Sequence, residues 1–350
     1  MPYDHGGDWA GFYAAHGALP LDFSANISPL GLPKGVREAV IRALDQADRY
    51  PDPLCRDLRK AIGNAWQVPP NWVLCGNGAG DLIERAVQAV RPRLALVTAP
   101  TFSEYPAALR RIGCAVREVF LHPEDQFRLT EEFLSEITPD VDMVFLCEPN
   151  NPTGVTTDPA LLRQILDRCA VCGARLVVDE CFNGLLPDPA AHTLVPYLKN
   201  LSLLILNAFT KLYAMPGLRL GFALSADTAL LEAMGRCGQP WPVSNIAQAA
   251  GLAALADEGY PDRLRALLNK ARPALRRGLA ALGATAITGE ANYLLFHHPD
   301  LTLADKLAEK GILLRRCAGY PGLGPNWYRA AVRREEENQR LLEAIRQVTQ

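Results

Sequence analysis

The sequence predicts an α/β protein with a mainly parallel sheet covered by helices and a second, smaller α/β domain. Short apolar runs with little polar alternation recur along the chain, as is typical of strands buried on both faces. Amphipathic stretches of helix length separate most of these runs, a pattern typical of parallel strands joined by crossover helices. The chain has 350 residues. At roughly 150 residues per domain, that leaves room for about two domains.

The elements of the first part are expected in alternation. A helix is predicted to begin near Pro33, because apolar residues follow it at helical spacing. Strands are expected at 72–75, 94–98, 115–120, 143–147, 175–179, 201–206 and 219–224, with helices such as those over 81–90 and 158–169 between them.

The pattern changes after Gly238, where Pro240 and Pro242 interrupt it. The remaining stretch predicts helices over 245–257, 261–282, 303–310 and 335–348 and strands at 292–298, 312–316 and 327–332. We therefore expect three parts: an N-terminal segment without strands (1–45) that packs with the small domain, a large domain (46–240), and a small C-terminal domain (241–350).

Composition and charge exclude several classes of protein. Hydrophobic residues make up 49% and charged residues 21% of the chain, as in globular rather than disordered or fibrous proteins. Lysine and arginine total 36 against 38 acidic residues, whereas nucleic-acid-binding proteins usually show a basic excess. The apolar runs are far shorter than the roughly 20 residues that span a bilayer, and the N-terminus does not resemble a secretory signal. We expect a soluble cytoplasmic protein that binds neither nucleic acid nor membrane.

Nine cysteines cannot all pair, and several lie in apolar runs, where free thiols behave as small hydrophobic side chains. Cys169 and Cys172 form a CxxC motif inside a helical pattern, but no second CxxC or histidine pair completes a zinc site. We expect structural thiols and no metal site, and the role of Cys169 and Cys172 stays open.

Glycine and polar residues stand where predicted strands end, at Gly76, Asn150, Asp179 and Lys211. Because ligands of parallel sheets bind at the carboxyl ends of the strands, these residues mark a candidate site. Lys211 follows an almost uncharged run, so it is either a desolvated Schiff-base amine or the start of a solvated loop. For Asp179 three interpretations are open: it holds a proton on a heterocyclic nitrogen, it caps a helix, or it binds magnesium.

Other motifs are weaker signals by themselves. Residues 76–80 (GNGAG), between a strand and a helix, fit a phosphate cradle, although the GxGxxG pattern fails at Asp81. Residues 150–154 (NNPTG) fit either a plain turn or an amide that donates to a ring hydroxyl. Three arginines suit phosphate or carboxylate but are also ordinary surface charges: Arg219, Arg315 and Arg329.

Taken in order, strand–GNG–helix, PNNPTG, VVDE, TK and PGLRLG resemble the fold-type I pyridoxal-phosphate enzymes of the aminotransferase superfamily, over nearly the whole chain. The resemblance implies pyridoxal 5'-phosphate as cofactor, Lys211 as its Schiff-base residue and Asp179 as the partner of its pyridine nitrogen. It assigns Asn151 to the ring hydroxyl and the other cofactor contacts to Gly78, Ala79, Gly80, Phe102, Thr210 and Arg219. It also implies a homodimer, in which Tyr50 reaches the cofactor phosphate of the neighbouring subunit.

A finer resemblance is to the threonine-phosphate decarboxylases of the cobalamin pathway, a branch close to the histidinol-phosphate aminotransferases. It is carried by HGG at 5–7, DFSANISPLGLP at 22–33, RYPDP, ANYLLF and CAGYPGL. In that branch the substrate is bound by His5, Gly6, Asn26, Asn151, Arg315 and Arg329, with the two arginines gripping its phosphate and carboxylate. The implied reaction is decarboxylation of O-phospho-L-threonine to (R)-1-amino-2-propanol O-2-phosphate. The alternatives are a histidinol-phosphate-type aminotransferase and a decarboxylase of O-phospho-L-serine.

At three positions this sequence differs from what related enzymes commonly carry. Ala208 stands where relatives carry a serine that donates to the cofactor phosphate, and Gly80 stands where they often have threonine or serine. Each lost neutral hydrogen bond is worth about 0.5–1.5 kcal/mol, so we expect weaker cofactor binding, retained through Thr210 and Arg219. Phe182 stands where the aminotransferase branch commonly has tyrosine, which favours decarboxylation.

Overall fold

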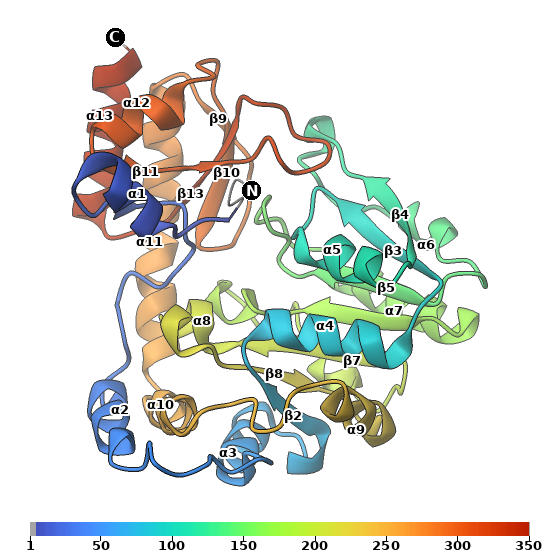
Figure 1. Cartoon of the computed structure of the whole chain (residues 1–350). Helices are drawn as coiled ribbons and strands as arrows, with labels where there is room; N and C mark the ends of the chain where they lie inside the picture. The colour runs from blue at the N-terminus through green and yellow to red at the C-terminus, as the bar shows by residue number, and fades with distance from the viewer. Residues whose placement is uncertain (1–4, 350) are drawn as a thin grey trace.

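A computed structural model of the chain describes residues 5–349 (Figure 1). Residues 1–4 and 350, the outer ends of the predicted N-terminal segment and small domain, lie outside the described residues. Seven strands form the central sheet, in the order β2-β8-β7-β6-β5-β3-β4. They are β2 (Val73–Gly76), β3 (Leu94–Ala99), β4 (Ala115–Phe120), β5 (Met143–Cys147), β6 (Arg175–Asp179), β7 (Leu203–Ala208) and β8 (Gly221–Leu224). Neighbouring strands are parallel except at β8, which is antiparallel to β2 and β7, so the predicted mainly parallel sheet is confirmed.

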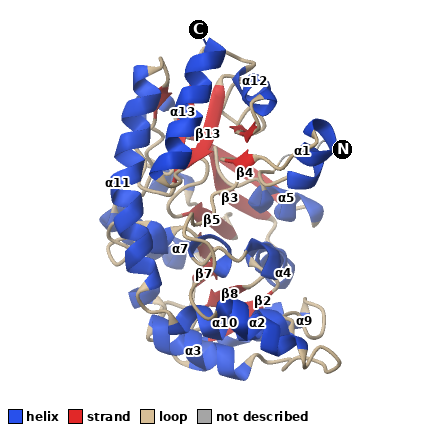
Figure 2. Ribbon diagram, turned by 90° about the vertical axis from the view of Figure 1, so that its left-hand side faces the viewer, coloured by secondary structure: helices blue, strands red, loops and turns tan. Residues whose placement is uncertain are grey.

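Helices cover both faces of this sheet (Figure 2). One face is covered by α4 (Ala79–Val90), α5 (Glu104–Arg111) and α9 (Thr228–Arg236), and the other by α6 (Phe133–Glu136) and α7 (Pro159–Cys172). Successive side chains of a strand point to opposite faces, yet Val177 and Val178 of β6 are both fully buried, each in a different apolar cluster. This double burial is why the strands of the sequence show little polar alternation.

The C-terminal part contains a second, antiparallel sheet of four strands in the order β12-β13-β10-β9. Its strands are β9 (Thr285–Ala286), β10 (Tyr293–His297), β12 (Arg315–Arg316) and β13 (Trp327–Ala331), accompanied by α11 (Tyr260–Ala281), α12 (Leu303–Glu309) and α13 (Glu335–Thr349). The strand expected at 312–316 is two strands, because β11 (Ile312–Leu313) pairs with β1 whereas β12 pairs with β13.

The N-terminal segment contains a strand, contrary to the prediction. β1 (Leu21–Asp22) pairs in parallel with β11. Two residues are too few to show a strand period in the sequence, so this element could not be predicted locally. The segment also carries α1 (Trp9–His16) and α2 (Val36–Leu44), and α2 packs against α10 (Asn245–Ala256), which in turn packs against α3 (Arg56–Trp66). The boundaries 1–45, 46–240 and 241–350 stay predictions.

The cysteines are free thiols. Cys169 is buried on α7, while Cys172, in its last turn, donates to the carbonyl oxygen of Ile137. The helix is followed by Gly173, whose φ of 75° provides a left-handed C-cap. No helix within residues 5–349 has the length and apolar character needed to cross a membrane.

Candidate active site

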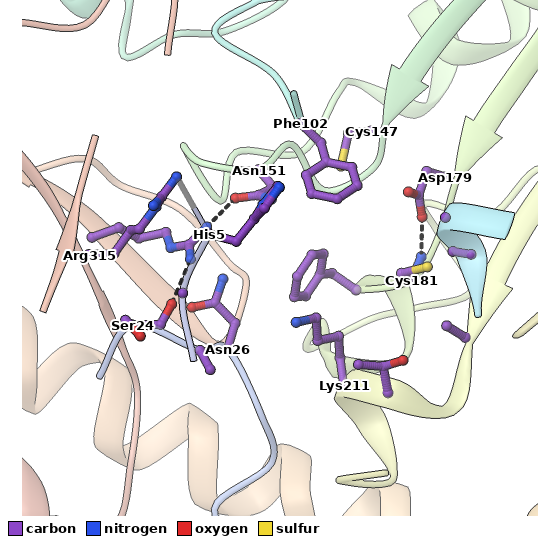
Figure 3. Close-up of a pocket in the computed structure, with 18 of the residues that line it drawn as sticks. His5, Ser24, Asn26, Phe102, Cys147, Asn151, Asp179, Cys181, Lys211 and Arg315 are labelled. Carbon is purple, nitrogen blue, oxygen red and sulfur yellow. Dashed lines mark hydrogen bonds between the residues drawn. The ribbon is translucent and has the colours of Figure 1, made fainter. Parts of the chain in front are cut away.

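A cavity of about 270 Å³ lies at the carboxyl ends of the large sheet, where the N-terminal segment and the four-stranded sheet meet it (Figure 3). The cavity brings together most residues that the sequence predicted for the site: His5, Gly6, Asn26, Ala79, Gly80, Phe102, Asn151, Asp179, Thr210, Lys211, Arg219, Arg315 and Arg329. Gly78 is the N-cap of α4 and directly precedes Ala79, the first residue of that helix, which lines the cavity. Tyr50 lies elsewhere, on the surface.

Lys211 is a desolvated amine rather than the start of a solvated loop. Strand β7 leads without a gap into the one-turn helix α8 (Phe209–Leu212), which carries Lys211 into the cavity. Burial lowers the pKa of Lys211 to about 8, and the positive charges of Arg329 and Arg219 act in the same direction. Its Nζ lies 5.7 Å from the centre of the Phe182 ring. An amine with a lowered pKa is neutral more often near neutral pH, as a carbonyl-attacking nucleophile requires.

Asp179 ends β6 as a buried carboxylate, 4% exposed, in the cavity wall. It accepts hydrogen bonds from the Tyr105 hydroxyl at 2.7 Å and from the backbone N–H of Cys181 at 3.0 Å. The N-cap position of the following short helix is Phe182, so Asp179 does not occupy it. A buried carboxylate facing a cavity fits a protonated ring nitrogen, since burial of an unpaired charge is costly.

The start of α4 forms an anion cradle. Gly78 is its N-cap with φ of 84°, and no side chain caps the first turn, which leaves backbone N–H groups for a phosphate. A Cβ at Gly78 would lie 2.9 Å from Arg219 Nη2, so the guanidinium sits against the cradle. Ala79, Gly80 and Thr210 complete this wall. These donors fit a phosphate group.

Two buried arginines face the other end of the cavity. Arg329, 5% exposed, donates to Asn151 Oδ1 and to the carbonyl oxygen of Ser24. Arg315, 7% exposed, lies over the ring of Tyr320. Within residues 5–349, Arg329 Nε and Asn26 Oδ1 are buried without a hydrogen-bond partner. Two guanidinium groups together with unpaired polar atoms make this end suitable for an anionic, hydrogen-bonding ligand.

The N-terminal segment forms a further side of the cavity. The Gly7 N–H donates to Ser24 Oγ at 2.8 Å, and a Cβ at Gly6 would lie 2.3 Å from the Ser24 carbonyl oxygen. Only glycine permits this approach of the two backbones. His5 therefore enters the cavity on the same side as Arg315 (Figure 3).

Tyr50 is the predicted site residue that lies apart from the cavity. It is 78% exposed and stacks on Trp241 at 4.2 Å between ring centres. Its predicted contact with a neighbouring subunit stays a prediction.

The sequence did not mark several residues that line or support the cavity. Ser24, Cys147, Cys181 and Tyr320 line it, and Tyr105 holds Asp179. Cys147 and Cys181 lie at or near strand ends, which was a usable signal. Tyr320 lies within the CAGYPGL motif, which was also a signal. Tyr105 carried none, because its contact with Asp179 arises only on folding.

A family model for aminotransferase class I and II matches residues 20–345, and the chain belongs to this family. It is 39% identical to the threonine-phosphate decarboxylase of Salmonella typhimurium, over 98% of this chain and 96% of that protein. It is 30% identical to the adenosylcobalamin biosynthesis bifunctional protein CobDQ of Leptospira interrogans, over 98% of this chain and 40% of that protein. The crystal structure of the histidinol-phosphate aminotransferase from Clostridium acetobutylicum is similar with a TM-score of 0.87 and 26% identity, covering 93% of this chain and 98% of that one. The expected fold-type I architecture is confirmed.

Proposed function

We propose that this chain decarboxylates O-phospho-L-threonine to (R)-1-amino-2-propanol O-2-phosphate, with pyridoxal 5'-phosphate as cofactor, in cobalamin biosynthesis. The observation that carries the proposal is one cavity lined by the desolvated Lys211 and the buried Asp179 at one end and by the buried Arg315 and Arg329 at the other. The first pair suits the cofactor typical of the family, and the arginines suit a substrate with two anionic groups. The 39% identity to a threonine-phosphate decarboxylase supports this choice of substrate.

The cofactor would be held by the groups that surround the Lys211 end of the cavity. Lys211 would bind its aldehyde, Asp179 would keep its ring nitrogen protonated, and Asn151 would donate to its ring hydroxyl. Its remaining contacts would come from Phe102 and, around the phosphate, from Gly78, Ala79, Gly80, Thr210 and Arg219. When bound, the cofactor supplies an electron sink for the carbanion at Cα of the substrate.

The chain's own contribution to the reaction is orientation. The bond at Cα that breaks is the one held perpendicular to the cofactor ring, so Arg315 and Arg329 would decide the reaction by placing the carboxylate there. His5, Gly6, Asn26 and Asn151 would complete the substrate site. Decarboxylation removes the carboxylate as carbon dioxide, and a proton must then be supplied to Cα in its place. Lys211, with a pKa of about 8, is suited to carry a proton at neutral pH.

We further propose a homodimer in which Tyr50 contacts the cofactor phosphate of the partner subunit. Tyr50 and Trp241 form an exposed aromatic pair next to a surface hollow that Arg219 also lines. An exposed stacked pair of this kind is suited to burial against a second copy.

The reaction is tested by incubating the purified, cofactor-loaded protein with O-phospho-L-threonine and O-phospho-L-serine in parallel. Trapping of carbon dioxide is expected to show that decarboxylation occurs. Mass spectrometry of the products is expected to identify aminopropanol phosphate. Lys211→Ala is the control, and it is expected to lose both turnover and the yellow colour of the lysine-bound cofactor. A coloured, active Lys211→Ala protein would contradict the assignment of Lys211.

The alternative function is that of a histidinol-phosphate-type aminotransferase, favoured by the structural likeness to such an enzyme. It predicts conversion of histidinol phosphate with 2-oxoglutarate to a carbonyl product and glutamate, without carbon dioxide. Phe182, in place of the common tyrosine, favours the decarboxylase.

A further inference from the structure

The carboxylate of Asp81 holds the loop that leads into α4. Its Oδ2 accepts a hydrogen bond from the backbone N–H of Asn77 at 2.8 Å, and a Cβ at Gly76 would lie 2.8 Å from the same oxygen. The carboxylate therefore lies against residues 76–77, directly before the Gly78 N-cap. It fixes the turn that directs the backbone N–H groups of the cradle, and it places a negative charge in the same helical turn as those groups.

A negative charge at this position opposes the binding of a second anion. The free N–H groups and the partial positive charge of a helix start favour one anion, and the Asp81 carboxylate already lies in that field. Its side chain is 25% exposed, so water screens the repulsion only in part. A phosphate therefore binds more tightly in the cradle when a cation compensates the charge of Asp81.

Arg85, one turn further along α4, supplies this cation. Its Nε donates to Asp81 Oδ1 at 2.8 Å, and its Nη2 lies 2.7 Å from Asp81 Oδ2. The arginine side chain is 3% exposed, so the two charges act on each other with little screening by water. Within residues 5–349, Nη2 is buried without a hydrogen bond, so it acts on Oδ2 through its charge.

The backbone at Gly238 fixes the guanidinium group from the other side. A Cβ at Gly238 would lie 2.2 Å from Arg85 Cζ, so any larger residue would displace the group. Gly238 belongs to the loop that follows α9. The position of the guanidinium group thus depends on a close approach that only glycine allows.

We propose that Arg85 is a positioning residue for the cofactor phosphate. It holds Asp81 against the loop and compensates the charge of that carboxylate, so that the start of α4 can accept a phosphate beside Arg219. This inference rests on the cofactor named in the proposed function. Arg85 is not among the residues that line the cavity, so it acts through Asp81 and does not touch the cofactor.

The test compares the affinities of the cofactor-free chain for pyridoxal 5'-phosphate and for pyridoxal, which lacks the phosphate. Arg85→Met is expected to bind pyridoxal 5'-phosphate at least about tenfold more weakly than wild type. Its affinity for pyridoxal is expected to stay within about twofold of wild type, because pyridoxal places no anion in the cradle. Absorbance of the lysine-bound ligand measures both affinities.

Arg175→Met is the matched control. Arg175 pairs with Asp227, the N-cap of α9, so it too compensates a carboxylate at a helix start. It begins β6, however, and therefore lies at the end of that strand opposite the site. Arg175→Met is expected to keep the wild-type affinity for both ligands.

Two further variants separate charge compensation from general loosening. The double variant Arg85→Met with Asp81→Asn is expected to bind pyridoxal 5'-phosphate within about threefold of wild type, since no uncompensated carboxylate remains. Gly238→Ala is expected to weaken binding of pyridoxal 5'-phosphate about three- to tenfold, because the new methyl group displaces the guanidinium group. Gly235→Ala, with open space around the new methyl group, is expected to keep the wild-type affinity.

Four results would each overturn the proposal: unchanged affinity for pyridoxal 5'-phosphate in Arg85→Met, an equal loss for pyridoxal, an equal loss in Arg175→Met, or no recovery in the double variant. If Arg85→Met does not fold, Gly238→Ala decides, and a wild-type affinity in that variant overturns the proposal. A wild-type protein that binds pyridoxal 5'-phosphate but releases no carbon dioxide from O-phospho-L-threonine contradicts the proposed function alone, because the titrations involve no turnover.

Discussion

At the scale of single residues, one cavity contains both a desolvated amine and a buried carboxylate. Burial lowers the pKa of Lys211 from 10.5 to about 8, whereas Asp179 is held by the Tyr105 hydroxyl and the Cys181 N–H. A lysine whose pKa is lowered on folding costs stability wherever its unfolded form is protonated. That cost is present in full below pH 8 and fades as the pH rises towards 10.5.

We therefore expect Lys211→Met to stabilise the cofactor-free protein. The gain in the free energy of unfolding is expected to be about 3 kcal/mol at pH 7 and less than half as large near pH 9.5, following about 1.36 kcal/mol per pKa unit. Urea unfolding of both proteins at the two pH values measures it. A gain that is the same at both pH values would show that methionine packing, and not relief of amine desolvation, is the cause.

At the scale of elements, the site depends on how strands end and helices begin. Strands β5, β6 and β7 are buried on both faces, so their sequences are continuous apolar runs that end in the residues of the site. The predicted strands 115–120, 143–147 and 175–179 coincide with β4, β5 and β6. Others are displaced by one or two residues, because the ladder of hydrogen bonds, and not the apolar run, sets where a strand stops.

The start of α4 leads to a second prediction. Gly78→Ala is expected to lower the affinity for pyridoxal phosphate at least about tenfold, because the new methyl group would displace Arg219 from the cradle and strain a backbone at φ of 84°. Absorbance titration of the cofactor-free protein with pyridoxal phosphate measures this. Gly113→Ala is the matched control, since Gly113 has φ of 78° but open space around its Cα. An equal loss of affinity in both variants would assign the effect to backbone strain alone.

At the scale of the whole molecule, the cavity is assembled from parts that are far apart in the sequence. The N-terminal segment supplies His5 and Asn26, the large sheet supplies Asp179 and Lys211, and the four-stranded sheet supplies Arg329. The segment reaches the cavity because β1 pairs with β11 and because Arg333 donates to the Asp22 carbonyl oxygen.

The proposed dimer predicts complementation between inactive variants. Tyr50→Ala and Lys211→Ala are each expected to lose most activity. In an equal mixture that has been allowed to exchange subunits, about a quarter of wild-type activity is expected to return, since each mixed dimer contains one intact site of two. Carbon dioxide release after exchange measures it. No recovery, with exchange demonstrated by mass spectrometry, would place Tyr50 outside the partner's site.

The sequence by itself determined the sheet, the order of its strands along the chain and the residues at the strand ends. Period and composition are local properties, so they locate β5 and β6 and mark Asp179 and Lys211 as candidate site residues, while the roles expected of these two residues came from the resemblance to a family. Only the tertiary structure decided that Tyr105 holds Asp179, that β1 pairs with β11, and that Glu104 meets His5. These contacts join residues that are distant in the chain, and no local period encodes them. Their cause is the burial of apolar surface by the whole chain, which brings the partners together only once the sheets and helices have packed.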